Sequence, residues 1–223
     1  MAVKNLEIIE CAIEQLDKKE PEMIKNMLIQ FLKENLQIPK AKKNLSVFDF
    51  VATDEEELGR RPVMGGVFMD KKNKVAVASD GHIMMVSKSE YKENKFKSGV
   101  ITKDGKNLPW KYANYEPILA QYKDKKPIEL YDEKTIIDMA LITKAEWELR
   151  EGESAPCIPI TADKECSIDF FPIRCLPILL SVGLEGWKHD RCAFLYEDDD
   201  MKIFIMGVVC SDNFTNKVCS NEK

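Results

Sequence analysis

The stretch "KVAVASDGHIMMVSK", residues 74–88, decides how the middle of the chain is interpreted. Runs of β-forming residues lie on both sides of the dipeptide Asp80-Gly81. Glycine adopts positive φ at little cost and aspartate tolerates it, so this dipeptide favours a tight turn. The stretch therefore predicts a β-hairpin. His82, one of two histidines in the chain, follows the turn directly.

Helical patterns are expected in four places outside the hairpin. The first forty residues predict two helices, the second of which begins at Pro21. Two more helices are expected. One is the stretch "PWKYANYEPILAQYK" (109–123), in which Pro117 favours a start nearer residue 116, and the other spans residues 173–184, where Pro177 comes early and Gly183 comes near the end. The apolar stripe of the first helix consists of Leu6, Ile9, Ile13 and Leu16.

Short runs rich in β-forming residues recur along the rest of the chain, and residues 53–61 between two of them are expected to form an acidic loop. Because strict strand–helix–strand alternation is absent, we expect an α+β fold of antiparallel sheets with helices packed on one face. The expected strands, besides the hairpin, are "SVFDFVA" (46–52), "PVMGGVFM" (62–69), "IELYDE" (128–133), "TIIDMALI" (135–142), "CIPITA" (157–162), "ECSIDF" (165–170), "CAFLYE" (192–197) and "MKIFIMGVV" (201–209).

Composition narrows the class of protein. The 223 residues carry a net charge of −5, which argues against a protein coated in positive charge. No apolar run has the length of a membrane span, and the N-terminus does not resemble a secretory signal. The seven cysteines form no C-x-x-C pair. We therefore expect a cytoplasmic protein with reduced, mostly buried thiols and no metal or cofactor.

Two groups of residues resemble a known family. The first group matches a run R-P-x-L-x-G-V, then a hairpin, then A-T-D-G-H-R-L, in the middle domain of the bacterial DNA polymerase III β sliding clamp. The second is "SIDFFPIRCLPILLSVGL" with "MKIFIMGVV", which resembles parts of that clamp's last domain. The chain is shorter than a three-domain clamp and departs from the motif at Ser79, Ile83 and Met84. The residues of the first group are Arg61, Pro62, Gly66, Val67, Ala78, Asp80, Gly81 and His82.

The resemblance implies a divergent, shortened clamp-like protein of a phage or mobile element. Clamps perform no chemistry: they encircle duplex DNA in DNA replication and bind short peptides of replication or repair proteins. The chain would then act as a homo-oligomer, with its helices side by side on a concave basic face. The implied division is an N-terminal helical segment 1–44, a clamp-like domain 45–164, a partial second domain 165–212 and a tail 213–223.

Site residues follow from the same resemblance. In the family, a hydrophobic peptide pocket is formed by the D-G-H hairpin and the final strand. The corresponding peptide-binding residues are Ser79, Gly81, His82, Ile83, Met84, Ile205, Met206, Gly207 and Val208. The candidate DNA contacts, chosen as cations on or near helices, are Lys25, Lys33, Lys111, Lys123, Arg174 and Lys188.

Simpler interpretations stay open. His82 is compatible with an ordinary hairpin position, with a pocket wall, or with a catalytic base that uses a nearby carboxylate. The lysines are equally compatible with a solvated surface, because cations are favoured near the carboxyl ends of helices. Two alternatives to a DNA clamp are therefore an interaction module that binds only protein and an enzyme that uses His82.

Overall fold

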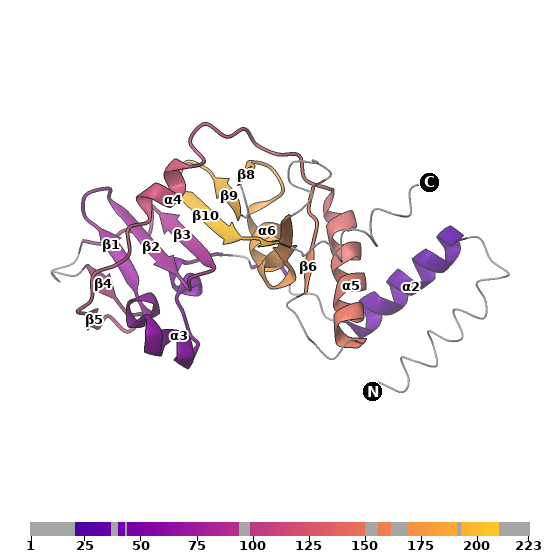
Figure 1. Cartoon of the computed structure of the whole chain (residues 1–223), viewed down its shortest axis with the longest axis horizontal. Coiled ribbons are helices and arrows are strands. Elements are labelled where there is room, and N and C mark those ends of the chain that lie inside the picture. The colour runs from indigo at the N-terminus through magenta and orange to yellow at the C-terminus, as the bar shows by residue number, and fades with distance from the viewer. Residues whose placement is uncertain are drawn as a thin grey trace.

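The computed structural model combines helices with antiparallel sheets, so the coarse prediction of an α+β fold is confirmed (Figure 1). The helix predicted around Leu6 to Leu16 and the tail 213–223 lie outside the described residues. Those described are residues 21–36, 40–42, 44–93, 99–149, 156–161, 169–190 and 193–209.

The main element is an eight-stranded antiparallel sheet with the strand order β5-β4-β1-β2-β3-β10-β9-β8. A second sheet has the order β11-β7-β6. The large sheet takes strands from both sides of the predicted boundary at residue 164. Its strands are β1 Val67–Asp70, β2 Val75–Ser79, β3 Ile83–Ser87, β4 Val100–Ile101, β5 Asn107–Leu108, β8 Trp187–Asp190, β9 Ala193–Glu197 and β10 Met201–Met206. Those of the small sheet are β6 Cys157–Ile158, β7 Asp169–Pro172 and β11 Val208–Val209.

The predicted hairpin is confirmed as β2 and β3, with Ser79 opposite Met84. The turn forms as its sequence suggests. Gly81 has a φ of 95°, and the carboxylate of Asp80 accepts the backbone N–H groups of His82 and Ile83 at 2.7 and 2.8 Å. The Asp-Gly pair therefore accounts for the tight turn without reference to any function.

The described helices include the one expected from Pro21. Of the helix expected across residues 109–123, only Glu116–Ala120 is helical, which agrees with the later start that Pro117 favours. The helix expected across residues 173–184 is also present, with Pro177 in its first turn and Gly183, at φ 92°, closing it. The α-helices are α2 Pro21–Asn35, α3 Glu55–Arg60, α4 Glu116–Ala120, α5 Glu133–Leu149 and α6 Leu176–Val182. Three 3-10 turns are η2 Val47–Phe50, η3 Pro62–Gly65 and η4 Ile173–Cys175.

Two predicted strands are helical instead. "SVFDFVA" contains η2, because Ser46 and Asp49 form a reciprocal capping box that closes a helical turn. "TIIDMALI" lies inside α5, which starts after Asp132. The Asp132 carboxylate accepts the backbone N–H of Thr135 at 3.0 Å, and its other oxygen accepts the Thr135 hydroxyl at 2.6 Å. Such a start favours a helix over the β-branched composition of the run.

Three further predictions were wrong in part. The residues of "IELYDE" before α5 form no strand, although Ile128 and Tyr131 donate their N–H groups to backbone carbonyls of Trp187 and Ile160. The first half of "PVMGGVFM" is η3, and only its end belongs to β1. The expected acidic loop 53–61 contains the short helix α3.

The large sheet is covered on both faces. One side, here called the α6 face, packs in one core with α6, η2 and the small sheet. The opposite side, here called the tyrosine face, is covered by the segment 109–126, which includes α4 (Figure 1). α6 packs on one face of the large sheet, as was expected of the helices, whereas α4 packs on the opposite face. The tyrosine face and its covering segment bury Val75, Val77, Met84, Val86, Leu195, Tyr112, Tyr115 and Tyr122.

Candidate functional site

The tip of the β2–β3 hairpin lies beside the end of β10. Strands β3 and β10 are antiparallel, with Ile83 opposite Ile205 and Met84 opposite Phe204. One pair further on, Met206 donates its backbone N–H to the carbonyl oxygen of His82 at 2.9 Å. The two stretches named from the sequence as peptide-binding are therefore neighbours in the sheet, although more than one hundred residues separate them in the chain.

Their side chains divide between the two faces, because successive residues of a strand point to opposite sides. Ile205 is fully buried on the α6 face, where Ile83 also packs. Met84 is buried on the tyrosine face. His82 is exposed, and Met206 is 44% exposed. A peptide on this surface would meet His82 and Met206 and would not reach Ile205.

Other predicted pocket residues hold the backbone of the turn and of the strand end. The hydroxyl of Ser79 donates to the carbonyl of Ile83 at 2.7 Å and accepts the N–H of Gly81 at 3.0 Å. Gly207 follows β10 directly, and the backbone of Val208 begins β11, which pairs with Phe170 of β7. These contacts fix the turn and the end of the sheet, so the surface is built on rigid backbone.

Two side chains beside the turn were not predicted as site residues. A Cβ atom placed on Gly81 would lie 3.2 Å from Nη1 of Arg61 and 3.6 Å from Sδ of Met64. Arg61 is exposed and Met64 is half-buried. Arg61 was part of the sequence match, but only the fold brings η3 against the hairpin tip. We call the surface formed by Arg61, Met64, Gly81, His82 and Met206 the tip surface.

The contacts of His82 bear on the catalytic interpretation. Its backbone N–H is held by Asp80 at 2.7 Å. Among the described residues, no hydrogen bond or ion pair joins the His82 imidazole to another side chain. The Asp80 carboxylate is occupied by two backbone N–H groups. Within the described residues, the imidazole therefore has no hydrogen-bonded group of the kind that orients a histidine base.

Metal-binding groups and thiols are two further kinds of reactive site. Within the described ranges, no group of three or more His, Cys, Asp or Glu side chains has the geometry to hold a metal ion. Cys175 is a buried thiol outside any disulfide, and burial raises its pKa to about 12. No helix in the described ranges has the length and apolar character needed to cross a bilayer.

The candidate DNA contacts do not gather on one face. Lys33 forms an ion pair with Asp138 at 2.9 Å, and Lys188 forms one with Glu197 at 2.9 Å. Lys111, Lys123 and Arg174 are exposed, and Lys25 belongs to α2. The expected row of helices is also absent from the described structure. α2 packs on α5 at one end of the molecule, while α4 and α6 lie on opposite faces of the large sheet (Figure 1).

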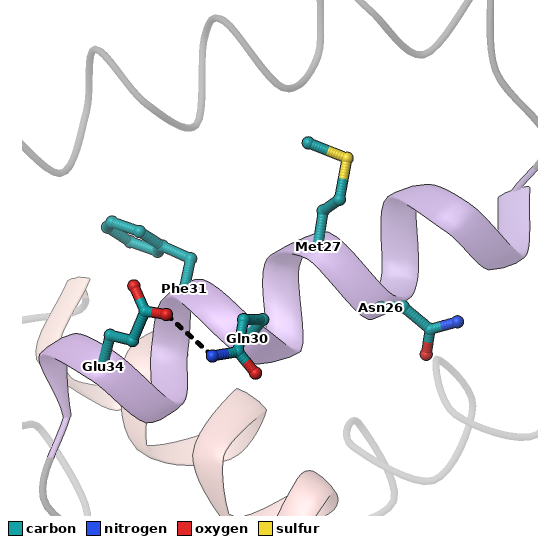
Figure 2. A pocket seen from close by; sticks show the side chains of 5 residues that line it. All are labelled: Asn26, Met27, Gln30, Phe31 and Glu34. Atoms are coloured by element: carbon teal, nitrogen blue, oxygen red, sulfur yellow. Dashed lines mark hydrogen bonds between the residues drawn. The ribbon is translucent and has the colours of Figure 1, made fainter.

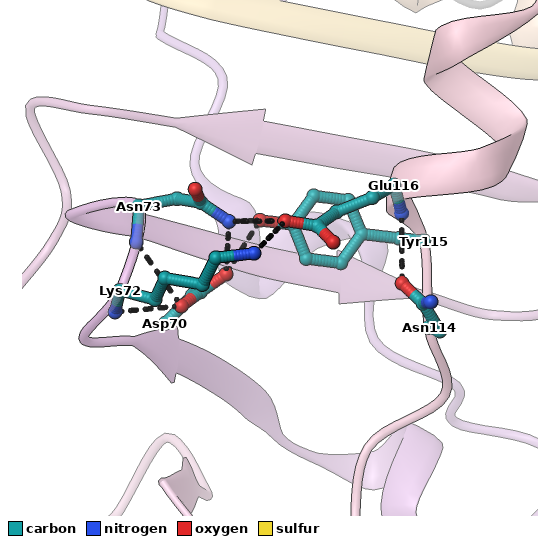
Figure 3. A network of polar contacts seen from close by, with 6 residues as sticks. All are labelled: Asp70, Lys72, Asn73, Asn114, Tyr115 and Glu116. Atoms are coloured by element: carbon teal, nitrogen blue, oxygen red, sulfur yellow. Dashed lines mark hydrogen bonds and ion pairs between the residues drawn. The ribbon is translucent and has the colours of Figure 1, made fainter.

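A polar network fastens the covering segment beside α4 (Figure 3). The Tyr115 hydroxyl donates to Asp70 at 2.7 Å, and the Asn73 amide donates to Asp70 and Glu116, both at 2.8 Å. Lys72 adds an ion pair to Glu116 at 3.0 Å. Burial acts to raise the pKa of Asp70, but the hydrogen bonds from Tyr115 and Asn73 outweigh it and lower that pKa. Burial and the neighbouring Asp70 raise the pKa of Tyr115.

Comparisons of the chain with protein-family models, with curated proteins and with solved structures find no match in any of the three.

Proposed function

We propose that this chain is a non-enzymatic, clamp-like protein that binds a short peptide of a partner protein at the tip surface. The observation that carries the proposal is the pairing of β3 with β10, which brings His82 next to Met206. Two stretches that are distant in the sequence thereby form one exposed patch at the end of a rigid sheet.

The chemistry of the tip surface supports peptide binding. Met64 and Met206 offer flexible, polarizable side chains, which adapt to apolar groups of different shape. Arg61 and His82 add polar groups beside them, which are suited to fix the orientation of a bound segment. The tip surface consists of five residues, so the proposal is a short linear segment rather than a folded domain.

The test is a titration of labelled clamp-motif peptides followed by fluorescence anisotropy. Met206→Asp and His82→Asp each place a charge on the tip surface, and we expect at least tenfold weaker binding. Ile142→Asp is the control, because Ile142 is a 41% exposed apolar residue of α5, at the other end of the molecule. If both tip variants bind as tightly as the parent chain, the peptide site is wrong.

A second candidate function is that the protein associates with DNA as an oligomer. Lys111 and Lys123 of the covering segment are exposed, and no ion pair joins either to a carboxylate within the described residues. Phosphate contacts of this kind weaken steeply with salt. The alternative, an interaction module that binds only protein, is favoured by the net charge of −5 and by the ion pairs of Lys33 and Lys188.

Duplex DNA titrated at rising salt separates these two candidates. Clamp-like association predicts binding that falls with salt and is weakened by the double variant Lys111→Glu with Lys123→Glu. The interaction module predicts no binding at any salt. Sedimentation velocity adds the oligomeric state: a strict monomer at high concentration contradicts a ring, and it leaves the peptide site standing.

A further inference from the structure

Arg61 places a positive charge on the tip surface. Its neighbour Arg60 forms an ion pair with Glu56 inside α3. Arg61 is exposed, and within the described residues no hydrogen bond or ion pair joins its guanidinium to another side chain. Asp80, in the adjoining turn, accepts two backbone N–H groups of that turn instead. The charge of Arg61 is therefore available to a ligand.

The local backbone fixes the place of this charge. The carbonyl oxygen of Arg61 accepts the N–H of Met64 at 3.0 Å, and this contact begins η3. Both side chains lie against Gly81: a Cβ atom placed there would be 3.2 Å from Nη1 of Arg61 and 3.6 Å from Sδ of Met64. Because glycine has no such atom, the guanidinium and the thioether share the space beside the turn.

Met206 and His82 complete the surroundings of the charge. Met206 is 44% exposed, and its backbone N–H donates to the carbonyl oxygen of His82 at 2.9 Å. Arginine binds a carboxylate through two parallel hydrogen bonds, and methionine side chains adapt to apolar groups of different shape. Together these groups suit a segment in which a carboxylate stands next to apolar residues.

We propose that the bound segment carries a carboxylate, which the guanidinium of Arg61 holds while apolar residues of the segment pack on Met64 and Met206. This inference rests on the proposed function, since it names the chemistry of the peptide that the tip surface takes. The phosphate backbone of DNA is the competing ligand. It would use the charge but leave both methionines without apolar partners, so the carboxylate-bearing segment is favoured.

The shallow hollow on α2 has the opposite charge (Figure 2). The residues that line it are Asn26, Met27, Gln30, Phe31 and Glu34. Glu34 is the one charged side chain among them, and it accepts the Gln30 amide at 2.7 Å. An acidic group there repels a carboxylate, whereas Arg61 attracts it. A segment with a carboxylate thus distinguishes the tip surface from this hollow.

Pairs of labelled peptides test the inference by fluorescence anisotropy. Amidated clamp-motif peptides carry Asp at one position at a time, and each has a counterpart with Asn at that position. We expect a position at which the Asp peptide binds the parent chain about fivefold more tightly, the size expected of a partly exposed charge pair. Arg61→Gln should make the two peptides equal. Arg61→Glu should reverse the preference, so that a peptide with Lys at that position binds more tightly than the Asp peptide.

Two controls accompany these measurements. Arg60→Gln removes the adjacent arginine, which is already paired with Glu56, so the preference for Asp should stay. Peptides without Asp, prepared with a free acid or an amide at the C-terminus, locate the source of the carboxylate. A preference for the free acid that Arg61→Gln abolishes supports the inference and assigns the carboxylate to the end of the partner chain.

Three results would overturn the inference. In the first, peptides bind and respond to Met206→Asp, but none prefers a carboxylate; the tip site then stands and its ligand chemistry is wrong. In the second, the preference for Asp survives Arg61→Gln. In the third, duplex DNA displaces the peptide from the parent chain but not from Arg61→Gln, which assigns Arg61 to phosphate. If no peptide binds at all, the proposed function itself fails, and the inference fails with it.

Discussion

The two faces of the large sheet are covered by different kinds of structure. On the α6 face, the covering elements contribute apolar side chains, and Phe171 packs edge to face against Trp187 and Phe194, with ring centroids 6.0 and 5.6 Å apart. On the tyrosine face, the cover is the segment 109–126, in which the described helix is only the five residues of α4. Tyr115 fixes this segment to Asp70 at 2.7 Å.

This difference shows how a segment with little regular structure can cover one side of a hydrophobic core. A regular helix bonds its own backbone, so α6 has only to supply apolar volume. The segment 109–126 instead combines buried rings with hydroxyl groups that bond at defined points. Tyr112 stacks on Phe68 at 5.3 Å, while the hydroxyl of Tyr122 donates to the carbonyl of Asp190 at 3.3 Å. We expect the α6 face to respond to lost volume and the tyrosine face to lost hydrogen bonds.

Trp187→Ala should produce the largest effect. Trp187 is fully buried, and its Nε1 donates to the carbonyl of Gly183 at 2.9 Å. Removing the ring leaves a cavity, so we expect the free energy of unfolding to fall by about 3–5 kcal/mol. Urea denaturation measures this change in the free energy of unfolding. Trp110→Ala is the control, because Trp110 is 46% exposed, and a comparable loss there would contradict the assignment of the core.

Tyr115→Phe should have a smaller effect that involves almost no change of volume. It removes the hydrogen bond to a buried carboxylate and a longer one, 3.3 Å, that the hydroxyl accepts from Asn73. The bond to the carboxylate corresponds to about 1.5–2 kcal/mol in the free energy of unfolding. Tyr122→Phe is the matched comparison on the same face, because its bond is longer and its acceptor is a neutral carbonyl. An equal loss in both variants would argue against the importance of the Asp70 anchor.

The smallest effect is the pH dependence of that anchor. The pKa of Asp70 in the folded protein lies below its ordinary value of 3.8. The carboxylate therefore contributes stability that is fully present above pH 3.8 and is lost as the pH falls through the folded pKa. The difference in unfolding free energy between Tyr115→Phe and the parent chain should shrink in acid. A difference that stays constant from neutral pH to pH 3 would rule out this linkage.

Turn and helix-end signals in the sequence correctly predicted the elements that depend on short-range interactions. The Asp80-Gly81 turn and the helix closed by Gly183 carry their own turn and end signals. The segment "TIIDMALI" was mistaken for a strand because its β-branched residues were given more weight than the helix-start signal at Asp132 and Thr135. "SVFDFVA" was mistaken for a strand for the same reason, because the capping box of Ser46 and Asp49 was given too little weight. Both signals were present in the sequence.

The sequence comparison named two stretches that the sheet brings side by side, but it did not separate their exposed side chains from their buried ones. Motif matching named consecutive residues, whereas the alternation of a strand sends Ile205 into the core and leaves Met206 exposed. That division follows from a period of two and was available from the sequence. The approach of Arg61 and Met64 to Gly81 was not, because it depends on how η3 packs against the hairpin tip.

The position of β10 inside the sheet, between β3 and β9, also sets an order of events during synthesis. The side chains of Ser87 at the end of β3 and Asp200 just before β10 meet at 3.3 Å, yet they are 113 residues apart in the chain. At a synthesis rate of about 5–20 residues per second, β3 waits on the order of ten seconds for its neighbour. Throughout that delay one edge of an apolar hairpin has open backbone groups, which is where nascent chains join one another. The newly made protein is therefore most prone to aggregate before its last long strand emerges.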